Sequence, residues 1–306
     1  MLHIEDIHIR DPFVVPSDGR YYLFGSTDKD IWRSPGVGFD MYVGTGSLDE
    51  FDGPFPAFRP PDGFWSAKNF WAPEVHPHRG AYYMFATFLP KKGRRGTAVL
   101  KSESGIMGPY LPWSLNAQGA PGNVTPAEWE CLDGTFFMEE GKPWMVFCHE
   151  WRQVGDGEIC AMPLTEDLMQ AAGEPRLLFR SSEAAWSYEL PARAPGSYVT
   201  DGPFMHRAQD GTLLMLWSAF GKEGNYCIGA ARSEDGTLLG RWKQDIDPLY
   251  AADGGHGMVF RDFDGTLRLA IHSPNSHSYE RAFFIAVTET NNTLRVSQNP
   301  VVNSRR

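Results

Sequence analysis

The sequence predicts an all-β fold: a single domain, residues 1–306, built as a five-bladed β-propeller with four-stranded antiparallel blades around a central channel. The main observation is a repeated sequence motif, called the phrase below. In it, a small or polar residue precedes an apolar run, a turn at glycine and a second, more aromatic run. This phrase occurs five times, at intervals of about 60 residues, which is typical of propeller blades. Helical periodicity is weak, and "TEDLMQAAG" at 165–173 is the only helix-like turn.

The copies of the phrase predict the two inner strands of each blade, at 11–27, 72–88, 133–151, 201–220 and 256–273. A looser second phrase predicts the outer strands, most clearly at 98–110, 159–170 and 228–242. Short segments at "MLHIEDI" or "NTLRVSQ" are expected to supply closing strands, with the chain ends meeting in the last blade. Such closure would remove an exposed sheet edge.

Composition narrows the function classes. A net charge of −10 and a pI of about 5.4 argue against nucleic-acid binding and against an anionic membrane partner. No apolar run approaches the roughly 18 residues of a membrane-spanning helix. The first residues lack the basic and apolar regions of a signal peptide, so a cytoplasmic location is expected. The four cysteines show no paired spacing and are predicted to be buried free thiols.

Propeller geometry predicts where the functional residues gather. The starts of the first strands and the ends of the second strands of all blades converge on one mouth of the channel. The first strands bring Asp11, Trp71 with Glu74, Asp133, Asp201 and His256 to this mouth. The second strands bring Ser26, Thr27, Phe88, His149, Glu150, Trp151, Ser218, His272 and Ser273. Several carboxylates, aromatic rings and a histidine in one pit indicate chemistry rather than packing.

Crowded carboxylates raise one another's pKa, so one can hold a proton near neutral pH while another is ionised. Glycoside hydrolysis needs this division, because one carboxyl protonates the leaving oxygen and another attacks or activates water. Aromatic walls suit the apolar C–H faces of sugars. The pit is therefore predicted to act on a carbohydrate.

The motifs "IRDPF", "FWAPEV", "LDGTFF", "TDGPF", "GGHGMVF" and "AIHSPNS" resemble glycoside hydrolase family 43, five-bladed propellers that act on arabinans and xylans. The resemblance covers nearly the whole chain. It implies that Asp11 is the general base and that Asp133 tunes the pKa of the acid and orients it. It also implies that "FWAPEV" frames the sugar through Trp71 and Glu74, and that His256 belongs to a central metal site, often calcium.

The chain departs from the family at the general acid, where "TDGPF" has Asp201 in place of glutamate. Aspartate is one methylene shorter, so its carboxyl has less reach. Three alternatives follow: Asp201 serves as the acid, another carboxylate such as Glu150 or Glu130 replaces it, or the protein binds sugar without hydrolysing it. Phe88, His149 and Trp151 are further predicted substrate contacts.

The resemblance implies an inverting glycosidase acting on α-L-arabinofuranosyl, or β-xylosyl, linkages of short plant-derived oligosaccharides, with Ca²⁺ in the channel. A glycoside phosphorylase is a weaker alternative, because phosphate needs a basic cluster and only Arg10 is basic among the predicted mouth residues. The run "KKGRR" at 91–95 is predicted to be a solvated hairpin tip.

Overall fold

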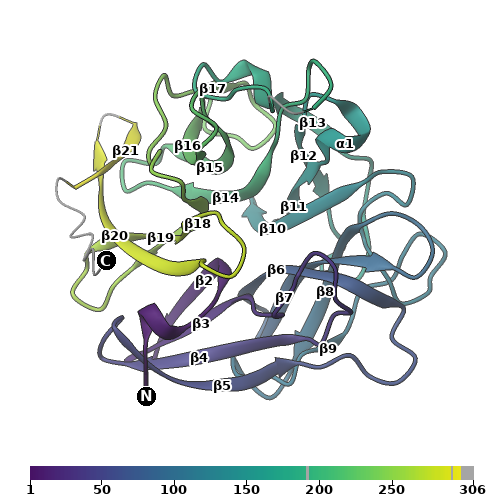
Figure 1. The fold of residues 1–306 in the computed structure, drawn as a ribbon. Helices are drawn as coiled ribbons and strands as arrows, with labels where there is room; N and C mark the ends of the chain where they lie inside the picture. The colour runs from purple at the N-terminus through teal and green to yellow at the C-terminus, as the bar shows by residue number, and fades with distance from the viewer. Residues whose placement is uncertain (191–192, 291, 298–306) are drawn as a thin grey trace.

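The computed structural model describes residues 1–190, 193–290 and 292–297 and contains five antiparallel sheets arranged around a channel (Figure 1). The predicted five-bladed β-propeller is confirmed. Each blade comes from one continuous segment, and its first strand is the innermost: β2, β6, β10, β14 and β18 face the centre of the ring. Within the described residues, no helix is long and apolar enough to cross a membrane.

The strands of the five blades follow one another in chain order. Blade I consists of β2 (Arg10–Ser17), β3 (Arg20–Ser26), β4 (Phe39–Thr45) and β5 (Glu50–Phe58). Blade II consists of β6 (Ser66–His78), β7 (Ala81–Pro90), β8 (Gly96–Ser102) and β9 (Leu111–Pro112). Blade III consists of β10 (Cys131–Glu139), β11 (Lys142–His149), β12 (Glu158–Pro163) and β13 (Arg176–Arg180). Blade IV consists of β14 (Asp201–Arg207), β15 (Leu213–Phe220), β16 (Tyr226–Ser233) and β17 (Trp242–Gln244). Blade V consists of β18 (Gly255–Arg261), β19 (Leu267–Ser273), β20 (Arg281–Thr290) and β21 (Thr293–Val296).

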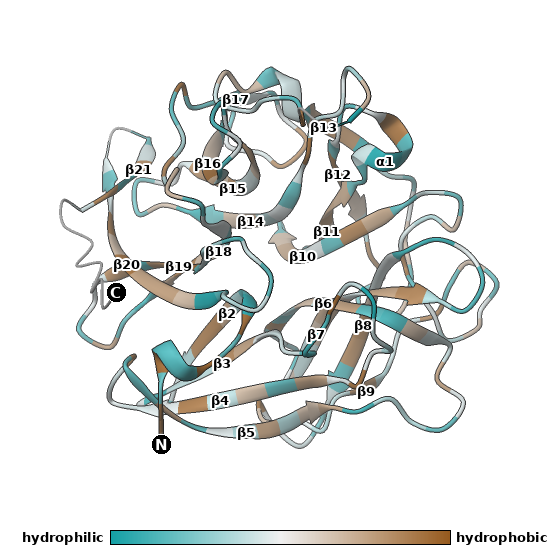
Figure 2. Cartoon of the chain, in the orientation of Figure 1, coloured by the Kyte–Doolittle hydropathy of each residue, from teal (hydrophilic) through white to brown (hydrophobic). Residues whose placement is uncertain are grey.

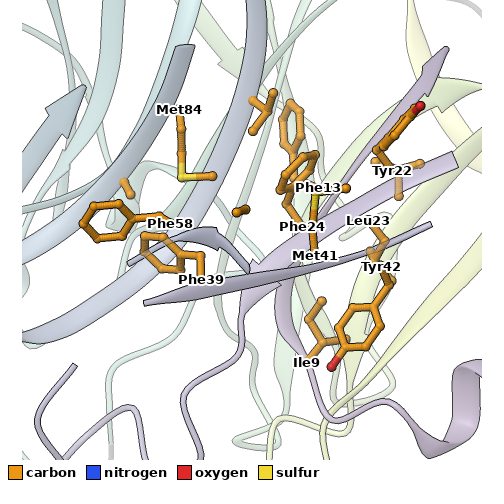
Figure 3. Packing of buried hydrophobic residues seen from close by; sticks show 14 of the residues in the cluster. Ile9, Phe13, Tyr22, Leu23, Phe24, Phe39, Met41, Tyr42, Phe58 and Met84 are labelled. Carbon is orange, nitrogen blue, oxygen red and sulfur yellow. The ribbon is translucent and has the colours of Figure 1, made fainter. Parts of the chain in front are cut away.

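Short elements complete the described chain. The 3₁₀ turns η1 (Ile4–Asp6) and η2 (Ser181–Glu183) lie before β2 and after β13, and the single-turn helix α1 (Trp151–Val154) follows β11. Apolar residues concentrate on the strands, whereas the connecting loops are mostly hydrophilic (Figure 2). Facing blades bury these side chains between them, as Phe13, Phe24, Phe39, Phe58 and Met84 do between blades I and II (Figure 3). All four cysteines are free and buried, as predicted.

Both end segments form strands, as predicted, but the expectation that the chain ends meet in the last blade is wrong. The N-terminal β1 (Leu2–His3) pairs with β5 at the outer edge of blade I, and β21 is the outermost strand of blade V. The terminal strands therefore cover the outer edges of two different blades. Instead of a shared sheet, polar contacts join blades V and I: the backbone N–H of Ile9 donates to the carbonyl of Glu280 at 3.3 Å, and Arg10 Nη1 donates to its buried carboxylate at 2.8 Å.

The same local distortion opens every blade. Asp11, Ala72, Asp133, Gly202 and His256 all have left-handed backbone angles, with φ between 46° and 56°. Each lies where the pairing of the first and second strands shifts register, which is the signature of a β-bulge. Left-handed φ is costly for residues other than glycine and concentrates at functional sites.

Hydrogen bonds across the blade junctions hold these strained residues. The backbone N–H of Ala72 donates to Ser26 Oγ at 2.8 Å, and that of His256 donates to Ser218 Oγ at 2.8 Å. The N–H of Asp133 donates to Thr87 Oγ1 at 2.8 Å. In each pair, the acceptor lies near the end of the second strand of the preceding blade. These bonds therefore fix neighbouring blades to one another at the site of the strain.

Thr87→Val should test this arrangement, because it keeps the shape of the side chain but leaves the N–H of Asp133 without its acceptor. An unsatisfied buried donor costs about 1–3 kcal/mol, so the free energy of unfolding in urea should fall by that amount. The exposed strand residue Thr45 provides the matched control, Thr45→Val. Equal stability of the two variants would contradict the importance of the junction bond.

Candidate active site

A pit of about 380 Å³ lies at the mouth of the channel. Eight residues predicted from the sequence line it: Arg10, Asp11, Asp133, Asp201, Glu150, Trp71, Trp151 and His256. Its floor carries carboxyl groups and its walls carry aromatic rings, so it combines charged groups with apolar surfaces. This composition suits a sugar better than a purely apolar or purely ionic ligand.

Asp11 and Asp133 occupy equivalent positions in blades I and III, on either side of His256. The Nδ1 atom of His256 lies 3.2 Å from Asp11 Oδ1 and 3.7 Å from Asp133 Oδ2. Ser26 Oγ donates to the second oxygen of Asp11 at 2.6 Å, and His272 Nδ1 accepts the backbone N–H of Asp11 at 3.2 Å. The two aspartates are thus held by different partners, although both are buried.

The environment of Asp11 favours its ionised form. Burial raises the pKa of this carboxyl, but His256, Arg10, His272 and the hydrogen bond from Ser26 together outweigh that effect and lower the pKa to about 2. Asp11 is therefore a carboxylate at any pH near neutrality. A permanently ionised oxygen at the floor of the pit can orient a water molecule and accept its proton.

Asp133 has the opposite tendency. Burial, followed by the negative charges of Asp201 and Asp11, raises the pKa of Asp133 well above its ordinary value. The backbone N–H of Gly202 donates to Asp133 Oδ2 at 3.1 Å and works against this rise. The protonation of Asp133 therefore depends on the charge of Asp201, its neighbour in blade IV.

Asp201 lies one residue earlier in its bulge than the sequence alignment implied. Gly202, and not Asp201, is the structural equivalent of Asp11 and Asp133, because it carries the left-handed φ of 51°. Asp201 itself pairs with Ser218 as Trp71 pairs with Thr87, so it occupies the position of a wall residue. A Cβ atom at Gly202 would lie 2.6 Å from His256 Cδ2, which explains why glycine follows Asp201.

This wall position gives Asp201 the properties of an acid. Burial and then the charge of Glu150 raise the pKa of Asp201 to about 7, while the hydrogen bond from Tyr226 partly opposes the shift. The phenol of Tyr226 donates to Asp201 Oδ2 at 2.9 Å and is itself buried. Asp201 can therefore carry a proton near neutral pH while Asp11 cannot.

Glu150 lies at the start of α1 and is paired with a cation. Arg95 Nη2 donates to Glu150 Oε2 at 2.8 Å, and Arg95 Nε donates to Glu130 Oε1 at 2.7 Å. Burial raises the pKa of Glu150, and the charge of Arg95 opposes the rise. Glu130, the other alternative acid, does not line the pit.

Trp71 forms part of the wall and is held firmly. Its indole N–H donates to the carbonyl of Ile31 at 2.7 Å, and its ring meets Trp32 edge-on at 4.9 Å between centroids. The guanidinium of Arg95 lies 4.9 Å from the centroid of the Trp71 ring. A fixed ring of this kind can stack on a sugar.

Three predicted substrate contacts do not line the pit. Phe88 is fully buried among the aromatic rings of the core between blades I and II. The ring of His149 stacks on Trp129, with 4.2 Å between the centroids, and its Nδ1 is hydrogen-bonded to Glu158. Glu74 is bonded to His76 at 2.9 Å. The prediction for Phe88 and His149 is wrong because strand alternation turns their side chains away from the mouth. Glu74 lies close enough to His256 for its charge to raise the pKa of that imidazole, but it does not line the pit.

The sequence analysis also missed several lining residues, chiefly Trp32, Arg95, Arg152, Arg193, Tyr226, Asn275 and His277. Arg95 and Tyr226 share one cause. The second and third strands of a blade are antiparallel, so the third strand begins at the same mouth where the second ends; Arg95 precedes β8 and Tyr226 begins β16. Arg95 is 7% exposed and belongs to the site, which corrects the prediction of a wholly solvated tip at 91–95.

The residues near His256 do not form a direct cation site. In the part of the chain that the structure describes, no group of three or more His, Cys, Asp or Glu side chains is placed to hold a metal ion. The Asp133 oxygen that faces His256 already accepts a hydrogen bond from the backbone of Gly202, and the other oxygen of Asp11 accepts one from Ser26. The calcium ion predicted at His256 stays a prediction, with contact through water rather than by direct bonds.

Comparison with known proteins agrees with this geometry. The sequence model of the family Glycosyl hydrolases family 43 matches residues 4–294. The crystal structure of an endo-arabinase from Bacteroides thetaiotaomicron VPI-5482 superposes with a TM-score of 0.85 and 36% identity, over 95% of this chain and 98% of that chain. A probable arabinan endo-1,5-alpha-L-arabinosidase B from Aspergillus fumigatus is 23% identical over 84% of this chain and 72% of its own length. Xylosidase/arabinosidase 43A from Humicola insolens is 26% identical over 64% of this chain and 74% of its own length.

Proposed function

The chain belongs to family 43 of the glycosyl hydrolases, and we propose that it hydrolyses α-L-arabinofuranosyl linkages of short plant-derived oligosaccharides with inversion, β-xylosyl linkages being the alternative. The observation that carries the proposal is the pair of carboxyls with opposite proton affinities, Asp11 with a pKa of about 2 and Asp201 with a pKa of about 7. The arabinose specificity is supported by the similarity to an endo-arabinase and to a probable arabinan endo-1,5-alpha-L-arabinosidase.

Asp11 acts as the general base. An inverting glycosidase uses an ionised carboxylate to take a proton from the water that attacks the anomeric carbon. Ser26 and His256 hold the two oxygens of Asp11, so its orientation is fixed before substrate enters. The substrate sugar sits above this carboxylate with Trp71 at its side.

Asp201 acts as the general acid and donates a proton to the departing glycosidic oxygen. Tyr226 positions one oxygen of Asp201 and leaves the other free to face the substrate. Burial and the negative charge of Glu150 keep the proton on Asp201. Glu150 is the alternative acid, but its ion pair with Arg95 favours its ionised form.

The substrate prediction is checked directly with two synthetic substrates. The wild-type protein should release nitrophenol from 4-nitrophenyl α-L-arabinofuranoside faster than from 4-nitrophenyl β-D-xyloside. Proton NMR of the first product from an arabino-oligosaccharide should show the anomer opposite to that of the substrate. Binding of sugar without turnover would instead support the non-catalytic alternative, and a product of retained configuration would contradict inversion.

The acid is identified by its dependence on the leaving group. Asp201→Asn should slow cleavage of an arabinobiose linkage by about 10²–10⁴-fold, the usual contribution of general acid catalysis. It should slow release of nitrophenol much less, because nitrophenolate departs without protonation. Asp11→Asn, which removes the base, should slow both substrates. If Glu150→Gln shows the leaving-group dependence and Asp201→Asn does not, the acid is Glu150.

The pH profile tests the same assignment independently. Because Asp201 must be protonated and has a pKa of about 7, kcat/KM should fall as the pH rises through about 7. The hydrogen bond from Tyr226 lowers the pKa of Asp201, so Tyr226→Phe should move this fall to higher pH. A fall at unchanged pH in the variant would show that another group limits activity.

A further inference from the structure

Four arginines line the pit, although the chain as a whole is acidic. They are Arg10, Arg95, Arg152 and Arg193. The sequence analysis expected only Arg10; Arg95 precedes β8, Arg152 lies on α1, and Arg193 lies in the connection between blades III and IV. Two of the four are neutralised within the protein, because Arg10 pairs with Glu280 and Arg95 pairs with Glu130 and Glu150.

The other two guanidinium groups converge on one ring. Arg152 follows Trp151 on α1, and Arg193 belongs to the connection between blades III and IV. Their Cζ atoms lie 5.5 Å and 5.8 Å from the centroid of the Trp151 ring. Among the residues that the structure describes, neither guanidinium forms an ion pair with a carboxylate. Two like charges therefore flank one indole ring at the rim, and neither is held in an ion pair.

Two cations near each other repel, which costs energy. The chain has a net charge of −10 and could have supplied an acidic side chain to pair with them. The carboxyls of the pit do so only in part: Asp11 lies beside Arg10, and the pKa of both Asp133 and Asp201 is raised. The charge of Arg152 lowers the pKa of Glu150, but the ion pair of Glu150 is with Arg95. Arginine recognises carboxylates through two parallel N–H groups, with fixed geometry and strong hydrogen bonds. The natural complement of this rim is therefore an anionic group carried by the substrate.

We infer that the rim formed by Trp151, Arg152 and Arg193 binds a sugar residue bearing a carboxylate, a hexuronic acid, beside the neutral sugar held at the floor. The inference rests on the proposed function, which places the scissile linkage over Asp11 and Asp201. The indole of Trp151 keeps both guanidinium groups in place by cation–π contact, so they are ordered before the ligand arrives. The substrate class is then an acidic oligosaccharide rather than a purely neutral one.

Calorimetric titration of the full chain tests this without requiring turnover. The probes are D-galacturonate with D-galactose and D-glucuronate with D-glucose. At low ionic strength, at least one hexuronate should bind about tenfold more tightly than its neutral partner, as expected for one charge-assisted hydrogen bond. The preference should weaken in 0.5 M NaCl, because screening reduces interactions at an open rim.

The double variant Arg152→Gln/Arg193→Gln should lose the preference, with the two members of each pair binding alike. Arg241→Gln is the matched control, because Arg241 is exposed and pairs only loosely with Glu234 at 3.7 Å; it should keep the preference. Equal binding of acid and neutral sugar to the wild type, or a preference that survives in the double variant, would overturn the inference.

Two further measurements separate the possible causes. Inorganic phosphate should bind more weakly than the hexuronate; phosphate of equal affinity would show a general anion site and overturn the sugar assignment. Hydrolysis of 4-nitrophenyl arabinofuranoside by the same wild-type preparation tests the proposed function alone. Turnover without a hexuronate preference would reject only the rim inference, whereas a hexuronate preference without turnover would reject only hydrolysis.

Discussion

The active site depends on one left-handed residue in each blade and on the hydrogen bond that holds it. A left-handed residue in a bulge turns the first strand, and its N–H is accepted by the neighbouring blade. Where this residue is Asp11 or Asp133, the strain aims a carboxyl at the channel. Where it is His256, it places an imidazole between the two carboxyls. The hydrogen bonds that join the blades into a ring therefore also position the carboxyls and the imidazole at the floor of the pit.

The junction between blades III and IV differs from the others in its acceptor, and it brings together the two carboxyls with raised pKa values, Asp133 and Asp201. Cys148 occupies the position equivalent to Ser26 and Thr87, so Gly202 donates its N–H to the carboxyl of Asp133 instead. The backbone of the strand that carries Asp201 is thus bonded directly to Asp133, whose pKa the charge of Asp201 raises. Because the carboxyls lie in one buried cluster beside the cation Arg10, burial and mutual repulsion separate their pKa values. Asp11 is ionised and Asp201 retains a proton.

The repeat in the sequence was sufficient to predict five blades and to bring Asp11, Asp133 and His256 together, because period and turn residues determine strand order. It could not resolve a register difference of one residue, and so it treated Asp201 as equivalent to Asp11 when Gly202 is. Phe88 was placed in the pit because position along a strand does not by itself reveal which face a side chain takes beside a bulge. Arg95 was missed because its partners, Glu130 and Glu150, come from another blade. Long-range ion pairs of this kind leave no local pattern.

The central claim is that Asp11 and Asp201 hold opposite protonation states at neutral pH. The most direct measurement is a carbon-13 NMR titration of protein labelled at the aspartate carboxyls, with Asp11→Asn and Asp201→Asn used to assign the two signals. The account predicts that the Asp11 carboxyl remains ionised from neutral pH down to the lowest pH at which the protein stays folded, while the Asp201 carboxyl titrates near pH 7. An Asp201 carboxyl that titrates near pH 4, the ordinary value for aspartate, would contradict it.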